Sequence, residues 1–448
     1  MLVTFKFNNC YSFKNQQVFS MIPGLMRTHN ERIFRGKNHF RLNKFAAFFG
    51  SNGSGKSNFV KSLSAMKSII IYGIETNKAQ AFRYLENQNE NTEFETELYL
   101  DQKMYSYGFT CNFKEKTIID EWLVEVKPTN DEYLLKNEKG SKPWINEEFL
   151  KDEKISNRLQ TYIDEVDENK NLLLLPKIVK STANSEIKDQ LLVFYNVFNY
   201  FYSKLNITTP NNYISLNGID LTNEKNLQRL ADLLHKFDTG ITKVIKAEVD
   251  ESRFKEEIPA ELYEDVMNDF QKDQTIVTSV VRSPSNFWIV KRTQDNSIVF
   301  DKVQFIHFGQ NDKPFDLKDE SDGTKRMFTL LDILLWDNDD TTFVVDELDR
   351  CLHPCLTRTF VNEFLQLAGK QDYKNQLIIS THESRLMNLK YLRRDEIWFV
   401  ANEGLKGSKI YPFDQFNARY DKVIDEAYLS GRFGAIPDFE NLTSGLEK

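Results

Sequence analysis

The pattern of apolar and polar positions predicts two strands near the start of the chain. Residues 2–8 alternate, with Val3, Phe5 and Phe7 separated by polar side chains, which is typical of a half-buried strand. Residues 44–50 (KFAAFFG) form a short apolar run that ends in glycine, which is the pattern of a buried strand.

A helix and a group of alternating strands are predicted to follow. In residues 56–74 apolar side chains recur three to four positions apart, which is the period of an amphipathic helix. Residues 92–126 alternate over two or three strands, with Asp101-Gln102-Lys103 as a hairpin turn.

The character of the chain changes from about residue 128. Segments 144–171 and 184–205 carry charged, amphipathic patterns that predict helices. Strand patterns return at residues 275–281, 286–292 and 303–308.

Beyond residue 325, helices alternate with the apolar strands TTFVVDE, NQLIIST and EIWFVAN. This alternation predicts a mainly parallel sheet in an α/β fold. We therefore expect residues 1–127 and 300–448 to form two lobes of one domain, with residues 128–299 as a mostly helical insertion.

The composition bounds the class of protein. A chain of 448 residues that is 40% hydrophobic can bury a sizeable core. No apolar run reaches the roughly 18–20 residues that span a bilayer, and the N-terminus lacks the pattern of a secretory signal. Four cysteines are too few for a disulfide framework in a chain of this size. We expect a cytoplasmic protein with no membrane partner.

The net charge of −8 argues against a surface that binds nucleic acid throughout. One segment differs, because residues 27–44 carry only one acid, Glu31, among several cations. These cations are Arg27, Arg32, Arg35, Lys37, Arg41 and Lys44. The segment is either a solvated basic loop that leads into the next strand or a contact surface for nucleotide phosphates, nucleic acid or a partner.

The strongest motif is GSNGSGKS at residues 50–57, which fits G-x-x-x-x-G-K-[ST] between a strand and a helix. The glycines let backbone N–H groups surround phosphates, aided by the positive end of the helix dipole. We expect Lys56 to reach the β- and γ-phosphates and Ser57 to ligate Mg²⁺. The predicted nucleotide-binding residues are Gly50, Ser51, Asn52, Gly53, Ser54, Gly55, Lys56, Ser57 and Asn58.

A P-loop needs an acidic partner for Mg²⁺ at the end of a neighbouring strand, and TTFVVDE (341–347) provides one. Asp346 is predicted to serve the water shell of Mg²⁺, and Glu347 to position or deprotonate the attacking water. Adjacent residues at a strand end point in two directions, which suits two separate roles.

Two further motifs narrow the class. ESDGTKRM (320–327) places Ser321 and Gly323 in a turn that opens a helix, which is an anion-binding arrangement. In QLIISTHES (376–384), His382 follows another apolar strand, at a position that suits a sensor of the γ-phosphate. Each motif alone is weak, but the order P-loop, Ser-x-Gly, Asp-Glu, His is specific.

That order resembles the ABC-type ATPase heads, in the branch that contains the SMC and RecF-like proteins. The resemblance implies a P-loop NTPase fold with a mixed or parallel sheet, bound ATP and Mg²⁺, and ATP hydrolysis. It makes Ser321 and Gly323 the signature, Leu348-Asp349 the D-loop and His382 the switch histidine. In that family two heads form a head-to-tail dimer around ATP, so the signature acts on the nucleotide of the partner. The insertion would then be a lid or a partner-binding segment.

The chain also resembles one prokaryotic group, the RloA/AbiL-type AAA ATPases of abortive-infection and restriction-linked loci. The similar stretches include FNNCYSFKNQQVFSM, ESDGTKRMF, DELDRCLHP, STHES, LRRDEIWFV and YLSGRFGAIPDF, and the likeness is weakest through 128–300. Cys10 and Tyr11 replace the usual Phe and Arg of the first stretch, so no role of that arginine is carried over. Proteins of this group are similar to the ATPases of two-gene antiphage systems, in which a nuclease-like second protein is the effector.

The segment CLHPC contains Cys351, His353 and Cys355, a spacing that suggests a zinc site. It lacks a second ligand pair at zinc-site spacing, and in the resembling family the His-Pro is not a metal ligand. A helix that starts with Pro354 in an early position explains the segment better. Gln88 is a further candidate, for a Q-loop, in a poor context.

Three functions are compatible with these patterns. The first is the sensor ATPase of an antiphage system, which dimerises with ATP and controls an effector encoded by a neighbouring gene. The second is a RecF-like ATPase of DNA repair or DNA ends, which would need a basic groove and DNA-stimulated hydrolysis. The third, the soluble ATPase of a transporter, is disfavoured because that class lacks a large insertion after the P-loop region.

Overall fold

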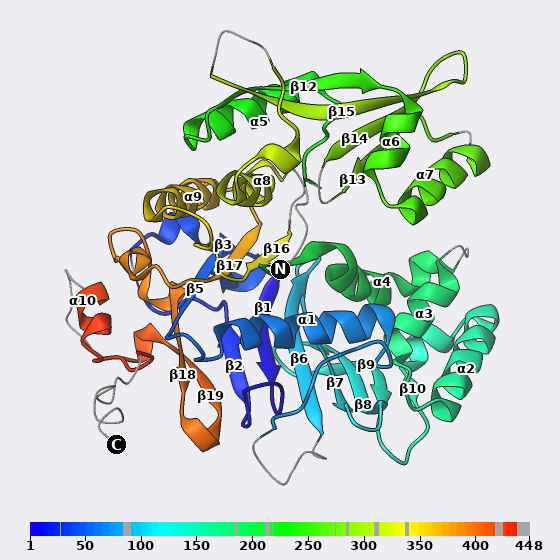
Figure 1. Ribbon diagram of the computed structural model, residues 1–448. Coiled ribbons are helices and arrows are strands. Elements are labelled where there is room, and N and C mark those ends of the chain that lie inside the picture. The colour runs from blue at the N-terminus through cyan, green and yellow to red at the C-terminus, as the bar shows by residue number, and fades with distance from the viewer. Residues whose placement is uncertain are drawn as a thin grey trace, which may run out of the picture. The chain divides into compact units, whose positions relative to one another are not determined.

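The computed structural model describes residues 1–26, 28–83, 91–183, 187–210, 216, 218–273, 275–283, 286–308, 313–336, 340–416 and 424–436. Contacts divide the chain into two compact units (Figure 1). Unit 1 consists of Met1–Thr209, Asp339–Leu348 and Leu365–Lys448, and unit 2 of Pro210–Asn338 and Asp349–Phe364.

Unit 1 contains a six-stranded sheet built from the apolar strands that the sequence predicts. The strands are β5 (Phe45–Phe49), β11 (Leu205–Thr208), β16 (Thr342–Val345), β17 (Gln376–Ser380), β18 (Ile397–Asn402) and β19 (Ser408–Pro412). Their order is β11-β16-β17-β5-β18-β19, and only the β18–β19 pair is antiparallel. Every side chain of β5, β16 and β17 is buried, which explains their continuous apolar runs. Because these strands are parallel, their carboxyl ends meet at one edge of the sheet.

Unit 1 also contains a seven-stranded antiparallel sheet with the order β10-β9-β8-β7-β6-β1-β2. Its strands are β1 (Leu2–Phe7), β2 (Gln17–Ser20), β6 (Thr92–Leu100), β7 (Lys103–Asn112), β8 (Thr117–Val126), β9 (Glu132–Asn137) and β10 (Trp144–Ile145). Between β6 and β7, Asp101 and Gln102 have φ of 48° and 66°, the left-handed conformation that suits a two-residue hairpin loop. The predicted hairpin is therefore confirmed.

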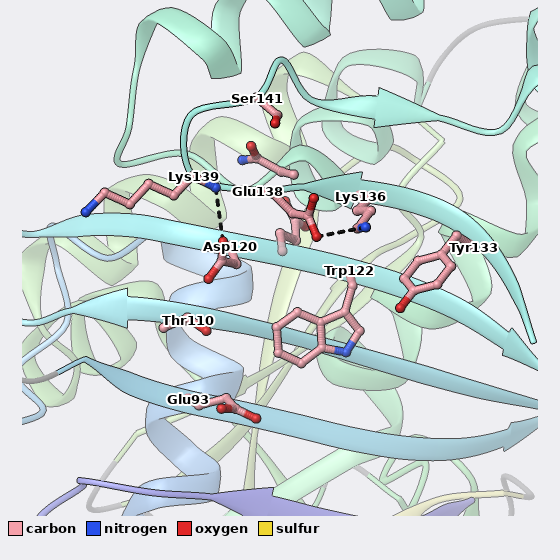
Figure 2. A pocket seen from close by; sticks show the side chains of 11 residues that line it. Glu93, Thr110, Asp120, Trp122, Tyr133, Lys136, Glu138, Lys139 and Ser141 are labelled. Atoms are coloured by element: carbon pink, nitrogen blue, oxygen red, sulfur yellow. Dashed lines mark hydrogen bonds and ion pairs between the residues drawn. The ribbon is translucent and has the colours of Figure 1, made fainter.

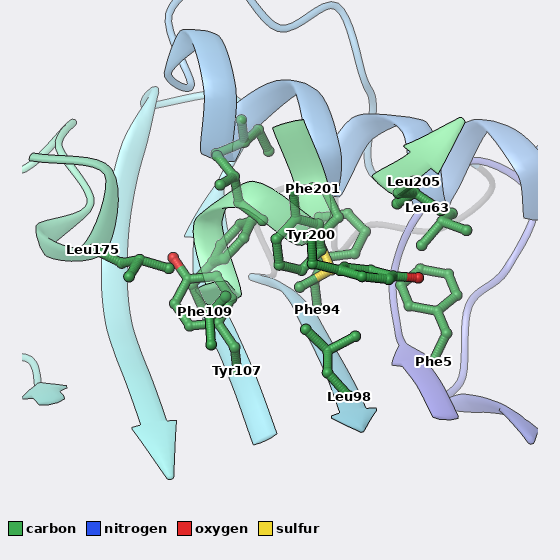
Figure 3. Close-up of a cluster of buried hydrophobic side chains, with 14 of the residues drawn as sticks. Phe5, Leu63, Phe94, Leu98, Tyr107, Phe109, Leu175, Tyr200, Phe201 and Leu205 are labelled. Atoms are coloured by element: carbon green, nitrogen blue, oxygen red, sulfur yellow. The ribbon is translucent and has the colours of Figure 1, made fainter. Parts of the chain in front are cut away.

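Helices cover one face of the antiparallel sheet. They are α1 (Lys56–Tyr72), α2 (Glu153–Glu168), α3 (Leu174–Thr182) and α4 (Leu192–Asn199), and a π-helical turn, Tyr200–Lys204, follows α4. Figure 3 shows Tyr107 and Phe109 of β7 close to Phe201 of this turn, and all three side chains belong to one buried apolar cluster. Burying this apolar surface holds the helices on the sheet.

Glu121 of β8 is a charged residue within this covered face. Its carboxylate accepts hydrogen bonds from the backbone N–H groups of Leu174 (2.5 Å) and Leu175 (3.0 Å), at the start of α3. The hydroxyl of Tyr107 donates to it as well, at 2.9 Å. Burial raises the pKa of Glu121 to about 7, against the effect of these three donors. Glu121 thus attaches α3 to the sheet.

The remaining elements of unit 1 are short. They are β3 (Phe34–Arg35), β4 (Arg41–Leu42) and α10 (Ile424–Leu429), together with the end of α9 (Pro354–Ala368), which begins in unit 2. Within the described part of the chain, no helix is both long and apolar enough to cross a membrane.

Unit 2 is built on a four-stranded antiparallel sheet with the order β12-β15-β14-β13. The strands are β12 (Ile241–Val249), β13 (Thr278–Arg282), β14 (Phe287–Arg292) and β15 (Ile298–His307), and the helices are α5 (Glu224–Lys236), α6 (Glu251–Glu257), α7 (Ala260–Lys272) and α8 (Asp322–Leu335). Phe254, Trp288 and Phe300 form the centre of one core cluster. Beside them the buried Lys302 pairs with Asp316 at 2.6 Å.

The predicted α/β fold of a P-loop ATPase is confirmed, with two local corrections. Trp144–Ile145 forms β10 and is not part of a helix, and α2 begins only at Glu153, where Asp152 caps it by accepting the N–H of Ile155. The described part of the insertion contains more helix than strand, as expected, yet it includes β12, for which no strand was predicted. The predicted division into two ATPase lobes, residues 1–127 and 300–448, and an insertion that acts as a lid or binds a partner, residues 128–299, stays a prediction.

Candidate nucleotide-binding site

The P-loop connects β5 to α1, as the sequence predicts, and the structure explains why two of its positions are glycine. A Cβ atom at Gly50 would lie 2.4 Å from the carbonyl oxygen of Val400, so no larger residue fits there. Gly55 has φ of +115°, a conformation that residues with a side chain rarely adopt. The backbone of this loop can therefore approach a ligand closely, as a phosphate-binding loop must.

Lys56 lies over the loop that precedes it. Its ammonium donates to the carbonyl oxygens of Gly50 (2.7 Å) and Ser51 (3.0 Å), and it lies 3.4 Å from Nδ1 of His382. The side chain is almost fully buried, at 5% exposure. The structure thus brings the predicted phosphate lysine and the predicted switch histidine together.

Asp346 and Ser57, the two residues predicted to serve Mg²⁺, also lie together. The Ser57 hydroxyl donates to Oδ1 of Asp346 at 3.2 Å. Mg²⁺ is usually held by one or two protein oxygens together with substrate phosphates and water. A carboxylate and a hydroxyl oxygen at this spacing, next to a phosphate-binding loop, fit that donor set.

Glu347 has a left-handed backbone, with φ of 48°, directly after the buried β16. This conformation costs a residue with a side chain roughly 1–2 kcal/mol, and strain of this kind is concentrated at functional sites. The change of backbone direction separates the side chain of Glu347 from that of Asp346. Two different roles for the two acids are therefore structurally possible.

Ser380 is a site residue that the sequence did not reveal. Its hydroxyl donates to Oδ1 of Asp346 at 2.5 Å and accepts the backbone N–H of Glu347 at 2.8 Å. Its carbonyl oxygen accepts the N–H of Leu348 at 2.9 Å. One serine at the end of β17 thus positions both predicted acids. The available signal was a hydroxyl residue at the end of the strand that precedes His382.

Two P-loop residues, Ser51 and Asn58, make structural contacts besides their predicted roles. The N–H of Ser51 donates to the carbonyl oxygen of Ala435 at 2.8 Å, in the YLSGRFGAIPDF stretch. The carbonyl oxygen of Asn58 accepts from Ser62 within α1, and the buried hydroxyl of Ser54 has no hydrogen-bond partner among the described residues. Asn52 and Gly53 are exposed. The loop is thus held at Ser51 and open at its tip.

A pocket of about 320 Å³ opens beside this tip. Its lining includes Ser12 from the first loop of the chain, Phe82 from the segment between α1 and β6, and Leu405 and Ser408 from the β18–β19 hairpin. A Cβ atom at Gly55 would lie within 3 Å of the hydroxyls of both serines, so the pocket adjoins the loop directly. The sequence did not predict this pocket, because its lining is assembled from three distant segments.

The predicted signature residues, Ser321 and Gly323, and Asp349 of the predicted D-loop lie in unit 2. Ser321 caps α8, because its hydroxyl accepts the N–H of Thr324 at 3.1 Å. A Cβ atom at Gly323 would lie 2.9 Å from the carbonyl oxygen of Cys351, so this turn packs closely on the segment that follows Asp349. The other predicted site residues belong to unit 1.

Cys351, His353 and Cys355 lie at the start of α9. Nδ1 of His353 accepts the N–H of Cys355 at 3.2 Å, and the helix begins at Pro354, as the helix-start interpretation predicts. Among the described residues, no three His, Cys, Asp or Glu side chains are grouped as metal ligands. The Q-loop candidate Gln88 lies outside the described residues.

The basic segment does not present all of its cations to solvent. Lys44 is buried and donates to the carbonyl oxygens of Ala368 (2.8 Å) and Lys370 (3.2 Å) near the end of α9. Arg32 is buried beside Glu396, at 3.5 Å. These two residues are structural, so the surface available for a polyanion is smaller than the sequence suggested.

The carboxyl edge of the parallel sheet is thus that of a P-loop ATPase. Residues 45–388 match the family described as "AAA domain, putative AbiEii toxin, Type IV TA system". The match covers more than half of the chain, and the protein belongs to this family.

Solved structures that are similar to this chain include two Smc head domains. One is the Smc head domain of Pyrococcus furiosus with an extended coiled coil, bound to the C-terminal domain of ScpA. Its sequence is 11% identical, the match covers 96% of this chain and 98% of that chain, and the TM-score is 0.40. The other is the Smc head domain of Pyrococcus yayanosii with a coiled coil and joint, at 11% identity, 96% and 99% coverage and a TM-score of 0.37. No curated protein matches the chain.

Proposed function

We propose that this protein is an ATP-driven switch that binds and hydrolyses ATP with Mg²⁺. The observation that carries the proposal is the convergence of Lys56, Ser57, Asp346, Ser380 and His382 at one edge of the sheet. Phosphoryl transfer needs mainly positioning and electrostatic stabilisation, and this edge offers both.

Each of these residues would have a separate role in ATP binding or hydrolysis. Ser57 and Asp346 would hold Mg²⁺, which supplies positive charge to the phosphate oxygens when it is bound. Lys56 would exchange the carbonyl oxygens that it now contacts for the β- and γ-phosphates. Glu347 would orient the attacking water and accept its proton, while His382 contacts the γ-phosphate. The pocket beside the loop tip, with Phe82 and Leu405, would take the adenosine.

The nucleotide state would control association with a second copy. Ser321 and Asp322 are exposed at the start of α8, where free backbone N–H groups favour anions. In a head-to-tail dimer this turn and Asp349 would contact the ATP that is bound to the partner copy. The site of one chain would then be completed by the other.

We further propose that the switch is the sensor of an antiphage system and holds a nuclease-like effector encoded by a neighbouring gene. Support comes from the resemblance along the chain to abortive-infection ATPases and from the family description, which names a toxin of a toxin–antitoxin system. The DNA-repair alternative is weaker, because Arg32 and Lys44 of the basic segment are buried.

The decisive variant is Glu347→Gln. It is expected to bind ATP normally, to lose hydrolysis by a factor of roughly 100 or more, and to accumulate as a dimer in ATP. Phosphate release and light scattering after size exclusion measure these effects. Lys56→Ala is the matched control and should lose nucleotide binding and the dimer together. Hydrolysis by Glu347→Gln at the wild-type rate would contradict the assignment.

The role in defence needs its own experiment. The product of the adjacent gene is co-expressed with the wild-type protein and with Lys56→Ala, and co-purification is compared with and without ATP. ATP-dependent recovery with the wild type alone supports the switch. A transmembrane permease as the neighbouring gene product would overturn the defence role.

A further inference from the structure

The seven-stranded sheet has a second face, opposite the helices, that the nucleotide site does not use. Directly paired residues on antiparallel strands point to the same face, so the register defines its side chains. Trp122 of β8 is paired with Gly108 of β7 and with Lys136 of β9, and Lys136 is paired with Trp144 of β10. Figure 2 shows this face, with α1 behind the strands.

Trp122 is the centre of the face. A Cβ atom at Gly108 would lie 2.4 Å from Cζ2 of Trp122, so the glycine makes room for the indole across β7. Nearby, Tyr133 is 45% exposed and Trp144 is 41% exposed. Trp and Tyr side chains are enriched among the residues that dominate protein–protein binding energies.

A pocket of about 490 Å³ opens on this face. Its lining includes Glu93, Asp120, Trp122, Tyr133 and Lys136. Figure 2 shows the indole of Trp122 between the side chains of Glu93 and Tyr133. The volume lies in the range of pockets that receive specific ligands.

The charges of this pocket are unevenly compensated. Nζ of Lys136 lies 2.7 Å from the carboxylate of Glu138, so Lys136 already forms an ion pair. The ammonium of Lys139 extends away from the pocket in Figure 2. The carboxylate of Glu93 has neither a hydrogen-bond donor nor an ion-pair partner within the described ranges. Burial, and then the neighbouring Glu95, raises the pKa of Glu93, and this outweighs the opposite effect of Lys6. A cation placed next to Glu93 would relieve this unfavourable environment.

We propose that this pocket receives an arginine side chain of a partner protein. A guanidinium group is planar, stacks on an indole and pairs with a carboxylate, and Trp122 and Glu93 supply these two contacts. Tyr133 and Trp144 extend the aromatic surface beyond the pocket, where they can contact the polypeptide on either side of the arginine. This extension favours a protein over a small free cation. The proposal goes beyond the switch function, because the pocket lies on a different sheet from the nucleotide site.

A short capped peptide with one arginine between glycine and serine residues is the probe, titrated into the full chain by calorimetry or saturation-transfer NMR. The same peptide with citrulline, which keeps the shape and loses the charge, is expected to bind at least about fivefold more weakly. Glu93→Gln should weaken the arginine peptide by a similar factor, and Trp122→Leu should abolish its binding. Glu148→Gln, the same change at an exposed residue outside the pocket, should leave it unchanged.

Two outcomes would overturn the proposal. The first is equal affinity for the arginine and citrulline peptides, or unchanged affinity in Glu93→Gln. The second is equal affinity for spermidine and the arginine peptide, because a polyamine has no flanking backbone for the aromatic surface to contact. ATP binding is measured in every variant. Glu93 belongs to β6 of the antiparallel sheet and not to the parallel sheet that carries the P-loop, so unchanged ATP affinity separates this proposal from the nucleotide site.

Discussion

The two sheets of unit 1 place their chemistry in different positions. In the parallel sheet, β5, β16 and β17 are buried on both faces, and the candidate site lies at their carboxyl ends. In the antiparallel sheet one face is covered by helices, and the other carries the Trp122 pocket. A sheet that is buried on both faces can offer only an edge to a ligand, whereas a half-covered sheet can offer a surface. In this protein the carboxyl edge is the candidate site for the phosphates of a nucleotide, and the open face is the proposed site for a polypeptide.

The largest expected difference between the two sheets is in their response to the same serine substitution. Ser380→Ala removes the hydroxyl that holds Asp346 and Glu347 and should lower kcat for ATP hydrolysis roughly 10- to 100-fold. Ser106→Ala removes a hydroxyl that donates to Glu95 at 2.7 Å in the antiparallel sheet and should not change kcat. Steady-state phosphate release measures both variants. Equal effects of the two changes would show that the edge of the parallel sheet is not special.

A smaller effect concerns the covered face of the antiparallel sheet. The pKa of Glu121 is about 7 in the folded chain, against an ordinary value of 4.5, so the folded state keeps a proton that the unfolded state releases between these pH values. The unfolding free energy should therefore fall as pH rises through this window, at up to about 1.4 kcal/mol per pH unit. Glu121→Gln should remove that part of the dependence.

Urea unfolding of the wild type and of Glu121→Gln at pH 5 and pH 8 measures the change. Glu396 also has a pKa raised to about 7 by burial. Its contribution to the pH dependence should remain in Glu121→Gln and be lost in Glu396→Gln, which serves as the control. A difference between the wild type and Glu121→Gln that is the same at both pH values would contradict the prediction.

The smallest expected effect compares strain in the two sheets. Glu347 at the parallel edge and Gln102 in the β6–β7 turn both have left-handed φ. Glycine at either position should raise the unfolding free energy by up to about 1 kcal/mol, because the strain is relieved. Gln102→Gly should leave ATP hydrolysis intact, whereas Glu347→Gly should abolish it. A loss of activity in Gln102→Gly would remove the distinction between structural and functional strain.

The parallel strands and the P-loop could be predicted because their signals are local. A strand buried on both faces has a continuous apolar run, and the phosphate loop has a fixed spacing of glycines around Lys56. Strand β10 could not be predicted, since Trp144–Ile145 gains its conformation from pairing with β9 and precedes a helix-like sequence. Ser380 was missed for a related reason: its importance arises from the register that places β17 next to β16.

The order of strands in the parallel sheet also determines when the chain can fold during synthesis. Strand β5 ends at Phe49, but its two neighbours, β17 and β18, begin at Gln376 and Ile397. Strands β6 to β9, in contrast, are consecutive along the chain and can pair as soon as they are made. At roughly 5–20 residues per second, the P-loop strand waits tens of seconds for its partners. A ribosome-bound chain would therefore display the Trp122 surface well before it could bind a nucleotide.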